Sequence, residues 1–324
     1  MAILILKSTE RCNSNCIYCD VKLNKQHAKQ MPIELLEIVY KRIDEYLLAV
    51  PDDDMLIIWH GGEPLLNGVE YFEAAHAFQK EICSATGYRI RNAIQSNITL
   101  MSEEFVSILK KMGINHIGTS YDPEPGIRGM GSMRDSDRYN RMFFDGLRLL
   151  KKHDINYGII YVVTRKSLEN PLGVFLFLSN LCTGFSMNPV LLYDDGRSEL
   201  AITPEEYVQF LGDIFPYWWR YKHRFMDVEP FISYTRIFQE NDISLGCVDS
   251  GGCAYNHLMI DPNGFCSQCG RASDWNLLSY GNIADRSIFD ILNDSQRKAL
   301  IKRNDILLNG ECNGCNYWDI CHGG

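Results

Sequence analysis

The chain has 324 residues, of which 46% are hydrophobic and 23% are charged, a composition typical of globular proteins. Its formal net charge of −9 and the lack of a Lys/Arg-rich run argue against a nucleic-acid partner, because binding phosphates requires clustered cations. The N-terminal segment lacks a signal-peptide pattern and no apolar run is long enough to span a membrane, so we expect a cytoplasmic protein with no membrane partner.

The first predicted element is an apolar strand at residues 3–7, and a cysteine-rich loop follows it directly. Cys12, Cys16 and Cys19 have the spacing C-x3-C-x2-C, which places three thiolates on one short loop. Three thiolates can hold three irons of a cubic iron–sulfur cluster and leave the fourth iron open to an outside molecule. That open position indicates an enzyme. A structural zinc loop is the alternative, although no partner pair of cysteines stands near this loop.

Strand-like runs then alternate with amphipathic helices as far as about residue 240. Further strands are predicted at residues 55–59, 89–95, 116–120, 156–163 and 185–191. Helices are predicted behind Pro32, behind Ser102, around residues 139–150 and behind the capping box that starts at Thr203. This order predicts an α/β fold, a partial (β/α)6 TIM-type barrel over residues 1–242, with its active site at the C-terminal ends of the strands.

Beyond residue 243 the composition changes to Gly, Asn and Cys with short elements, which predicts a small cysteine-rich domain over residues 243–324. Its candidate metal ligands are Cys247, Cys253, Cys266, Cys269, Cys312, Cys315 and Cys321. Grouped cysteines in a reducing compartment indicate metal ligation rather than disulfides. A zinc ribbon built from the two C-x2-C pairs is the alternative. Cys83 and Cys182 are predicted to be packing thiols.

The cysteine triplet, with Tyr18 before its third cysteine, resembles the radical S-adenosylmethionine (radical SAM) superfamily, and residues 59–64 resemble that family's GGEP element. The resemblance implies that SAM is bound by Tyr18, Gly61, Gly62, Glu63, Ser96, Asn97, Ser120, Asp122 and Arg128. Glu63 and the adjacent backbone are implied to bind the methionine amino group. Ser120 and Asp122 are implied to contact the carboxylate or the ribose, with Arg128 a further candidate for the carboxylate. Taken singly, such residues also occur as turns and helix caps.

The C-terminal cysteines resemble the SPASM extension of that superfamily. Cys253, Gly264 and Cys269 follow the C-x9–15-G-x4-C half of its pattern, and Cys312-x2-Cys315-x5-Cys321 follows the second half. The resemblance implies one or two auxiliary [4Fe-4S] clusters besides the SAM-binding cluster. The family's last cysteine is missing, so we expect either a truncated sequence or a branch without that ligand. Cys266 is an additional candidate ligand, beside Cys247, and the pairing stays open.

The resemblance also implies a reaction: reductive cleavage of SAM to a 5′-deoxyadenosyl radical, hydrogen abstraction from a ribosomally made precursor peptide, and formation of a C–C cyclophane or thioether cross-link. A separate leader-peptide-binding protein and an electron donor such as flavodoxin or ferredoxin are implied partners. The sequence identifies no catalytic residue. An anaerobic sulfatase-maturating enzyme, which forms formylglycine, is the alternative, and Gly270 after Cys269 disfavours it because those enzymes carry an acidic base there. A zinc-stabilised binding protein is the non-enzyme alternative.

Aromatic residues concentrate in the segment at 207–240 that bridges the two predicted domains. They are Phe215, Tyr217, Trp218, Trp219, Tyr221 and Phe225. We interpret this cluster as core, with a peptide-binding groove as the alternative.

Overall fold

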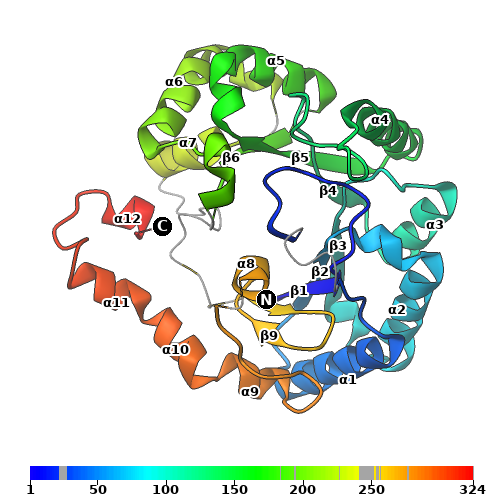
Figure 1. Cartoon of the computed structure of the whole chain (residues 1–324). Helices are drawn as coiled ribbons and strands as arrows, with labels where there is room; N and C mark the ends of the chain where they lie inside the picture. Colours follow the sequence, from blue (N-terminus) through cyan, green and yellow to red (C-terminus); the bar gives the residue numbers. More distant parts are fainter. Residues whose placement is uncertain are drawn as a thin grey trace.

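A computed structural model describes residues 1–323 except 22–27, 183, 193–194, 226, 241–251, 253–254, 256 and 276. Its strands surround a common interior, and helices α1 to α6 pack around the outside of this wall (Figure 1). The C-terminal helices continue from the edge of the barrel that carries β1 (Figure 1).

The strands form one sheet in the order β7-β6-β5-β4-β3-β2-β1-β8-β9. Their bounds are β1 (Ala2–Thr9), β2 (Met55–Gly61), β3 (Ile90–Gln95), β4 (His116–Ser120), β5 (Asn156–Val163), β6 (Gly184–Pro189), β7 (Asp227–Glu229), β8 (His257–Ile260) and β9 (Cys266–Ser267). Neighbouring strands pair in parallel, except for the antiparallel pair β8 and β9. The predicted α/β class and partial barrel are confirmed, and the first six strands lie where the sequence predicts them.

The helices of the barrel follow the strands in alternation. The helix bounds are α1 (Ile33–Ala49), α2 (Val69–Glu81), α3 (Glu103–Lys111), α4 (Ser136–Lys152), α5 (Pro171–Leu181), α6 (Pro204–Tyr221), α7 (Phe231–Glu240), α8 (Gly270–Asp274), α9 (Ile288–Leu292), α10 (Ser295–Ile301), α11 (Arg303–Leu308) and α12 (Trp318–Cys321). The predicted caps form: Ser102 accepts a hydrogen bond from the Phe105 N–H at the start of α3, and Thr203 and Glu206 make the capping box of α6.

The two faces of each barrel strand have different surroundings: one packs against the helices and the other faces the barrel interior. On β2, Met55, Ile57 and Trp59 are buried, and the Trp59 ring lies 5.2 Å from that of Phe72 on α2. The residues between them face the barrel interior, because side chains alternate along a strand. The apolar core therefore lies between sheet and helices, and the inner face of the barrel is left to line cavities.

The C-terminal region is joined directly to the barrel sheet. Strand β8 pairs in parallel with β1, so the sheet continues into this region. The Arg42 side chain on α1 also donates hydrogen bonds to the carbonyls of Ile283 and Ala284, at 3.2 and 3.0 Å. The domain boundary predicted at residues 242–243 lies outside the described residues.

The aromatic cluster of the bridging segment is divided between core and surface. Trp218 is 1% exposed and its ring lies 5.0 Å from that of Phe231, whereas Phe215 and Trp219 are about two-fifths exposed. The core interpretation thus holds for Trp218. Among the helices that the structure describes, none combines the length and apolar character needed to cross a bilayer.

Candidate cofactor site

The three loop cysteines lie where β1 ends, at the C-terminal edge of the barrel. Cys16 is buried, and Cys12 and Cys19 are partly buried. Burial, together with nearby groups that include Glu63 for Cys12 and Cys16 for Cys19, raises the pKa of the Cys12 thiol to about 12 and that of Cys19 to about 11. Thiols with such pKa values stay protonated and unreactive near neutral pH unless a metal cation replaces the proton. Their environment therefore suits metal ligands better than nucleophiles.

Two glycines hold the cysteine loop against the barrel. Gly61 has φ +138°, and a Cβ there would lie 2.2 Å from the Thr9 carbonyl oxygen; a Cβ on Gly62 would lie 2.1 Å from that of Arg11. The Gly62 and Glu63 N–H groups donate to the Thr9 and Arg11 carbonyls, both at 2.8 Å. Since only glycine permits this approach, the pair fixes the position of the cysteine loop.

Glu63 is fully buried behind the cavity rather than in its wall. Its carboxylate accepts hydrogen bonds from Ser96 Oγ and the Asn97 N–H, both at 2.7 Å, and from the Leu65 N–H at 3.0 Å. Burial raises the pKa of this carboxyl to about 7. In this structure Glu63 therefore positions the end of β3, and its contact with the methionine amino group stays a prediction.

Asn97 connects the end of β3 to the cysteine loop. Its Nδ2 donates to Asn13 Oδ1 at 2.9 Å and to Ser14 Oγ at 3.1 Å, and lies 3.9 Å from Cys12 Sγ. Asn13 also donates to Thr99 Oγ1 at 2.8 Å. Hydrogen bonds between side chains of the protein thus hold the loop against the end of β3.

A buried guanidinium lies on the other side of the loop. Arg128 is 7% exposed, donates to Asp122 and to the Tyr18 hydroxyl, and places Nη1 3.7 Å from Cys16 Sγ. Asp122 also accepts from Tyr18 at 2.7 Å and from the Val162 N–H at 2.9 Å. Because these three donors engage both Asp122 carboxylate oxygens, Asp122 orients Arg128, and Arg128 is the group that reaches the cavity.

Most of the predicted site residues surround one cavity of about 470 Å³ inside the barrel. Those that line it are Cys12, Cys16, Tyr18, Cys19, Gly61, Gly62, Ser96, Asn97, Ser120 and Arg128. Glu63 and Asp122 stand behind its wall. The structure thus brings together residues from four strand ends that are more than a hundred positions apart in the sequence.

Sequence reasoning missed several residues of the site. His60 and Gln95 line the cavity, and the alternation along β2 and β3 was the available signal, since Trp59 and Ile94 face the helices. Enclosure within the barrel and the charge of Lys7 lower the pKa of His60 to about 4, so its imidazole is neutral.

Two long-range contacts with the cysteine loop and β1 had no sequence signal. Arg197 donates to the Tyr18 carbonyl at 2.7 Å and to Asp20 Oδ1 at 2.8 Å, which ties the loop to the segment after β6. Lys7, 4% exposed at the end of β1, pairs with Asp274 on α8 and so links the barrel to the C-terminal region.

The geometry also bears on the zinc alternative. Within the described parts of the chain, no three His, Cys, Asp or Glu side chains converge closely enough to bind one metal ion. The three loop thiols open instead onto a shared cavity, an arrangement that fits a larger iron–sulfur cluster better than a tetrahedral zinc ion.

The C-terminal cysteines that the structure describes differ widely in exposure. Cys266 is fully buried and burial raises the pKa of its thiol to about 12, whereas Cys315 and Cys321 are exposed, with Cys269 and Cys312 in between. Cys247 and Cys253 lie outside the described residues. The assignment of all these cysteines to auxiliary clusters stays a prediction.

Family models match both parts of the chain. The model described as the radical SAM superfamily matches residues 6–178, and the one described as a SPASM iron–sulfur cluster-binding domain matches residues 252–316.

Curated relatives include sulfatase-maturating enzymes. A serine-type anaerobic sulfatase-maturating enzyme of Bacteroides thetaiotaomicron is 30% identical over 64% of this chain, a match that spans about half (54%) of that protein's length. A cysteine-type enzyme of Clostridium perfringens is 24% identical over 100% of this chain and 88% of its own.

Solved structures share the fold. Native anSMEcpe with bound AdoMet and Cp18Cys peptide superposes with a TM-score of 0.83 at 22% identity, covering 99% of this chain and 88% of that one. Streptococcus suis SuiB bound to S-adenosylmethionine has a TM-score of 0.66 at 16% identity, covering 100% and 72%.

Proposed function

Because this chain belongs to the radical SAM superfamily and carries a SPASM iron–sulfur cluster-binding region, we propose that it oxidatively modifies a peptide substrate. The observation that carries this proposal is the shared cavity, in which three thiols, the glycine pair and the polar ends of β3 and β4 meet at the C-terminal edge of the barrel. Active sites of such barrels lie at this edge.

The cofactors of this family are SAM and [4Fe-4S] clusters, and the loop thiols Cys12, Cys16 and Cys19 would hold the SAM-binding cluster. When bound, this cluster and SAM together supply a carbon radical that abstracts hydrogen from the substrate. Cys266, Cys269 and the three last cysteines would serve auxiliary clusters, together with Cys247 and Cys253.

We expect the side chains and backbone of the protein to bind and orient SAM and to shield the reaction from water. The Gly61–Gly62 backbone, Ser96, Asn97 and Ser120 offer hydrogen-bonding groups to the polar end of SAM, since all line the cavity. Apolar side chains in the same wall, among them Ile58, Ile160 and Val162, exclude water from a reaction that stray hydrogen donors would quench.

Arg128 adds a fixed positive charge near the metal-ligating sulfur of Cys16. A hydrogen-bond donor at that distance favours the more negative, reduced state of the site. Asp122 and Tyr18 hold the guanidinium in place, so we assign them positioning roles.

The product that we propose is an intramolecular cross-link. Gly270 follows Cys269, and the nearest following carboxylate, that of Asp274, is already paired with Lys7 and so is not a free base. Formylglycine formation is the second candidate, and the whole-length likeness to the Clostridium perfringens maturase favours it.

Product analysis separates the two candidates. Anaerobically reconstituted enzyme, reductant and SAM are incubated with precursor peptides encoded beside the gene and with Cys- or Ser-containing sulfatase peptides. A precursor that loses two hydrogen atoms and gains no hydrazine-reactive aldehyde supports cross-linking, whereas an aldehyde on a sulfatase peptide supports the second candidate. Failure to form 5′-deoxyadenosine under these conditions contradicts both. A leader-peptide-binding protein and a flavodoxin or ferredoxin are the partners that we propose to add if turnover is slow.

A further inference from the structure

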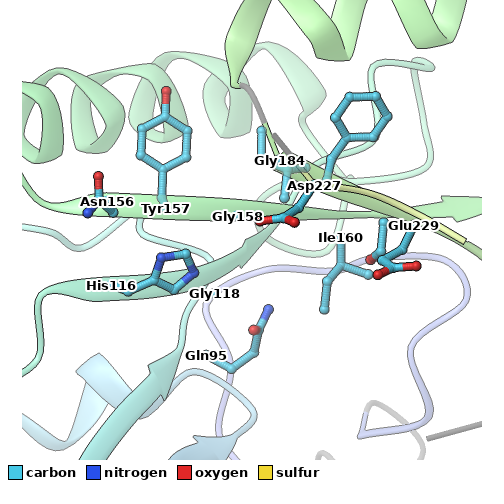
Figure 2. A pocket seen from close by; sticks show the side chains of 13 residues that line it. Gln95, His116, Gly118, Asn156, Tyr157, Gly158, Ile160, Gly184, Asp227 and Glu229 are labelled. Atoms are coloured by element: carbon cyan, nitrogen blue, oxygen red, sulfur yellow. The ribbon is translucent and has the colours of Figure 1, made fainter. Parts of the chain in front are cut away.

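A second cavity, of about 460 Å³, lies on the inner face of β3 to β7, toward the N-terminal ends of β4 to β7. It shares Gln95 and Ile160 with the cofactor cavity, so the two spaces adjoin within the barrel. Figure 2 shows the side chains of Gln95, His116 and Glu229 around this inner space.

A row of glycines keeps the inner cavity open. Gly118 pairs with Gly158 across β4 and β5, and Gly184, next in the row on β6, pairs with Asp227 on β7. The register of Ile159 with Phe185 places Gly158 beside Gly184. Barrel interiors are normally filled by branched side chains at such positions, and glycine within a strand often marks the close approach of a ligand.

The walls of this cavity are rich in hydrogen-bond acceptors. Asp227 and Glu229 bring two carboxylates, and no Lys or Arg stands among the described residues that line the space. Gln95 donates through Nε2 to Ser120 Oγ at 3.2 Å, which leaves its carbonyl oxygen over Gly118 as a further acceptor. The cavity therefore suits a positively charged guest with several donors.

The geometry argues against a metal ion as that guest. His116, Asp227 and Glu229 do not converge on a point, since no three potential ligands among the described residues lie close enough to bind one ion. A guanidinium or ammonium group on a flexible stem spreads its donors over a wider space, and its stem packs against apolar wall such as Ile160.

We propose that the inner cavity binds the Arg or Lys side chain of the substrate peptide, with its stem passing the glycine row and its charged end at Asp227 and Glu229. This inference rests on the proposed function and names the residue class that the barrel accepts. A side chain anchored there leaves its own backbone-proximal carbons at the boundary with the cofactor cavity, where hydrogen abstraction takes place.

The test compares charged probes with neutral probes of the same shape. The reconstituted enzyme with SAM is titrated with the capped peptide Ac-Gly-Arg-Gly-NH2 and its citrulline counterpart, and with the corresponding lysine and norleucine peptides, by saturation-transfer NMR. We expect at least one charged peptide to bind about tenfold more tightly than its neutral counterpart, the effect of a charge-assisted hydrogen bond. Equal binding within both pairs overturns the inference.

Two variants test separately whether binding depends on the carboxylates of the cavity or on the free space beside its glycines. Asp227→Asn combined with Glu229→Gln should abolish the preference for charge, whereas the control Glu205→Gln, on the exposed face of α6, should keep it. Gly158→Val should weaken binding of the charged peptide more than tenfold while both carboxylates remain; a Cβ there meets no atom closer than 3.6 Å, and valine favours strand conformation. Circular dichroism and iron content confirm that each variant is folded and loaded.

The controls also separate this inference from the proposed function. Wild-type enzyme that forms 5′-deoxyadenosine but shows no preference for charge contradicts the inference alone. Enzyme that fails to cleave SAM contradicts the proposed function, whatever it binds. A double variant that keeps the wild-type preference overturns the assignment to β7.

Discussion

The two cysteine-bearing regions of this chain are organised in opposite ways. Several parts of the protein contact the N-terminal cysteine loop. Gly61 and Gly62 pack against its backbone, Asn97 at the end of β3 donates hydrogen bonds to it, and Arg128 and Arg197 contact it from later segments. The last three cysteines, Cys312, Cys315 and Cys321, lie in a turn-rich segment that ends in the short helix α12, and two of them are exposed. A site that binds and orients a second molecule needs preorganised ligands, whereas a closed cluster can order the chain that wraps it.

Removing the thiols of the N-terminal loop should have the largest effect on SAM cleavage. Cys12→Ala, Cys16→Ala or Cys19→Ala should abolish 5′-deoxyadenosine formation, because each removes one iron ligand of the SAM-binding cluster. Chromatography of the reaction after anaerobic reconstitution measures the product. Cys83→Ala, at a buried thiol 3.6 Å from the Tyr40 carbonyl, is the matched control and should retain SAM cleavage. Cleavage by any of the three loop variants would refute the ligand assignment.

Arg128→Gln should lower the rate of SAM cleavage by about tenfold to a hundredfold, since a positive charge beside Cys16 favours the reduced state. The midpoint potential of the loop cluster, measured by redox titration with EPR detection, should become more negative. Arg128→Lys should recover part of the shift. An unchanged potential in the glutamine variant would show that Arg128 acts only in packing.

The affinity for SAM should depend on pH through Glu63. Burial raises the pKa of this carboxyl to about 7, so it is ionised above that pH and progressively protonated below it. Ionised Glu63 accepts three hydrogen bonds that order Ser96 and Asn97, and we expect the affinity to fall by about tenfold between pH 8 and pH 6. Equilibrium binding at each pH measures it. Glu63→Gln should flatten the profile; the same slope in that variant contradicts the assignment.

Substituting one glycine of the Gly61–Gly62 pair should have a smaller effect, which tests whether the cysteine loop is preorganised. Gly62→Ala should reduce the free energy of unfolding by about 2 kcal/mol, because its Cβ would lie 2.1 Å from the Arg11 carbonyl oxygen and the loop must shift. Chemical denaturation of the iron-free protein measures this without the cluster. Gly212→Ala on α6, where the Cβ meets open space, should leave stability unchanged or raise it slightly.

The smallest effect on SAM cleavage is expected from the C-terminal region. Cys315→Ala should lower the iron content while 5′-deoxyadenosine still forms without substrate, because this exposed thiol lies outside the cofactor cavity. Iron analysis and product chromatography on the same sample test both parts. Complete loss of SAM cleavage would mean that the two regions are not independent.

The sequence predicts the barrel well because its signals are local. Alternating apolar runs place the first six strands, and Ser102 and Thr203 cap helices where expected. Strand β8 was not predicted, since four residues carry little periodicity and pairing with β1 decides their conformation. Pairing between strands that are far apart in the sequence leaves no local sequence pattern from which it could be predicted.

The candidate site also contains residues that a local sequence pattern predicts and residues that it does not. The cysteine spacing and the glycine pair have sequence signatures, and the structure gathers these residues around one cavity. The burial of Glu63 and Asp122 was not predictable from local patterns: both are buried and neither lines the cavity, and their contacts with SAM stay predictions. Alternation along β2 and β3 could have identified His60 and Gln95. The glycine row instead depends on the pairing of β4, β5 and β6, which local sequence patterns do not specify.

The central claim is that Cys12, Cys16 and Cys19 hold a cluster with one iron left open to SAM. The most direct test is EPR and electron–nuclear double resonance of the reduced enzyme with SAM labelled in its amino nitrogen and carboxylate oxygen. We predict couplings from both labels that vanish in Cys16→Ala. A cluster with an unchanged spectrum and no coupling to either label would contradict this claim.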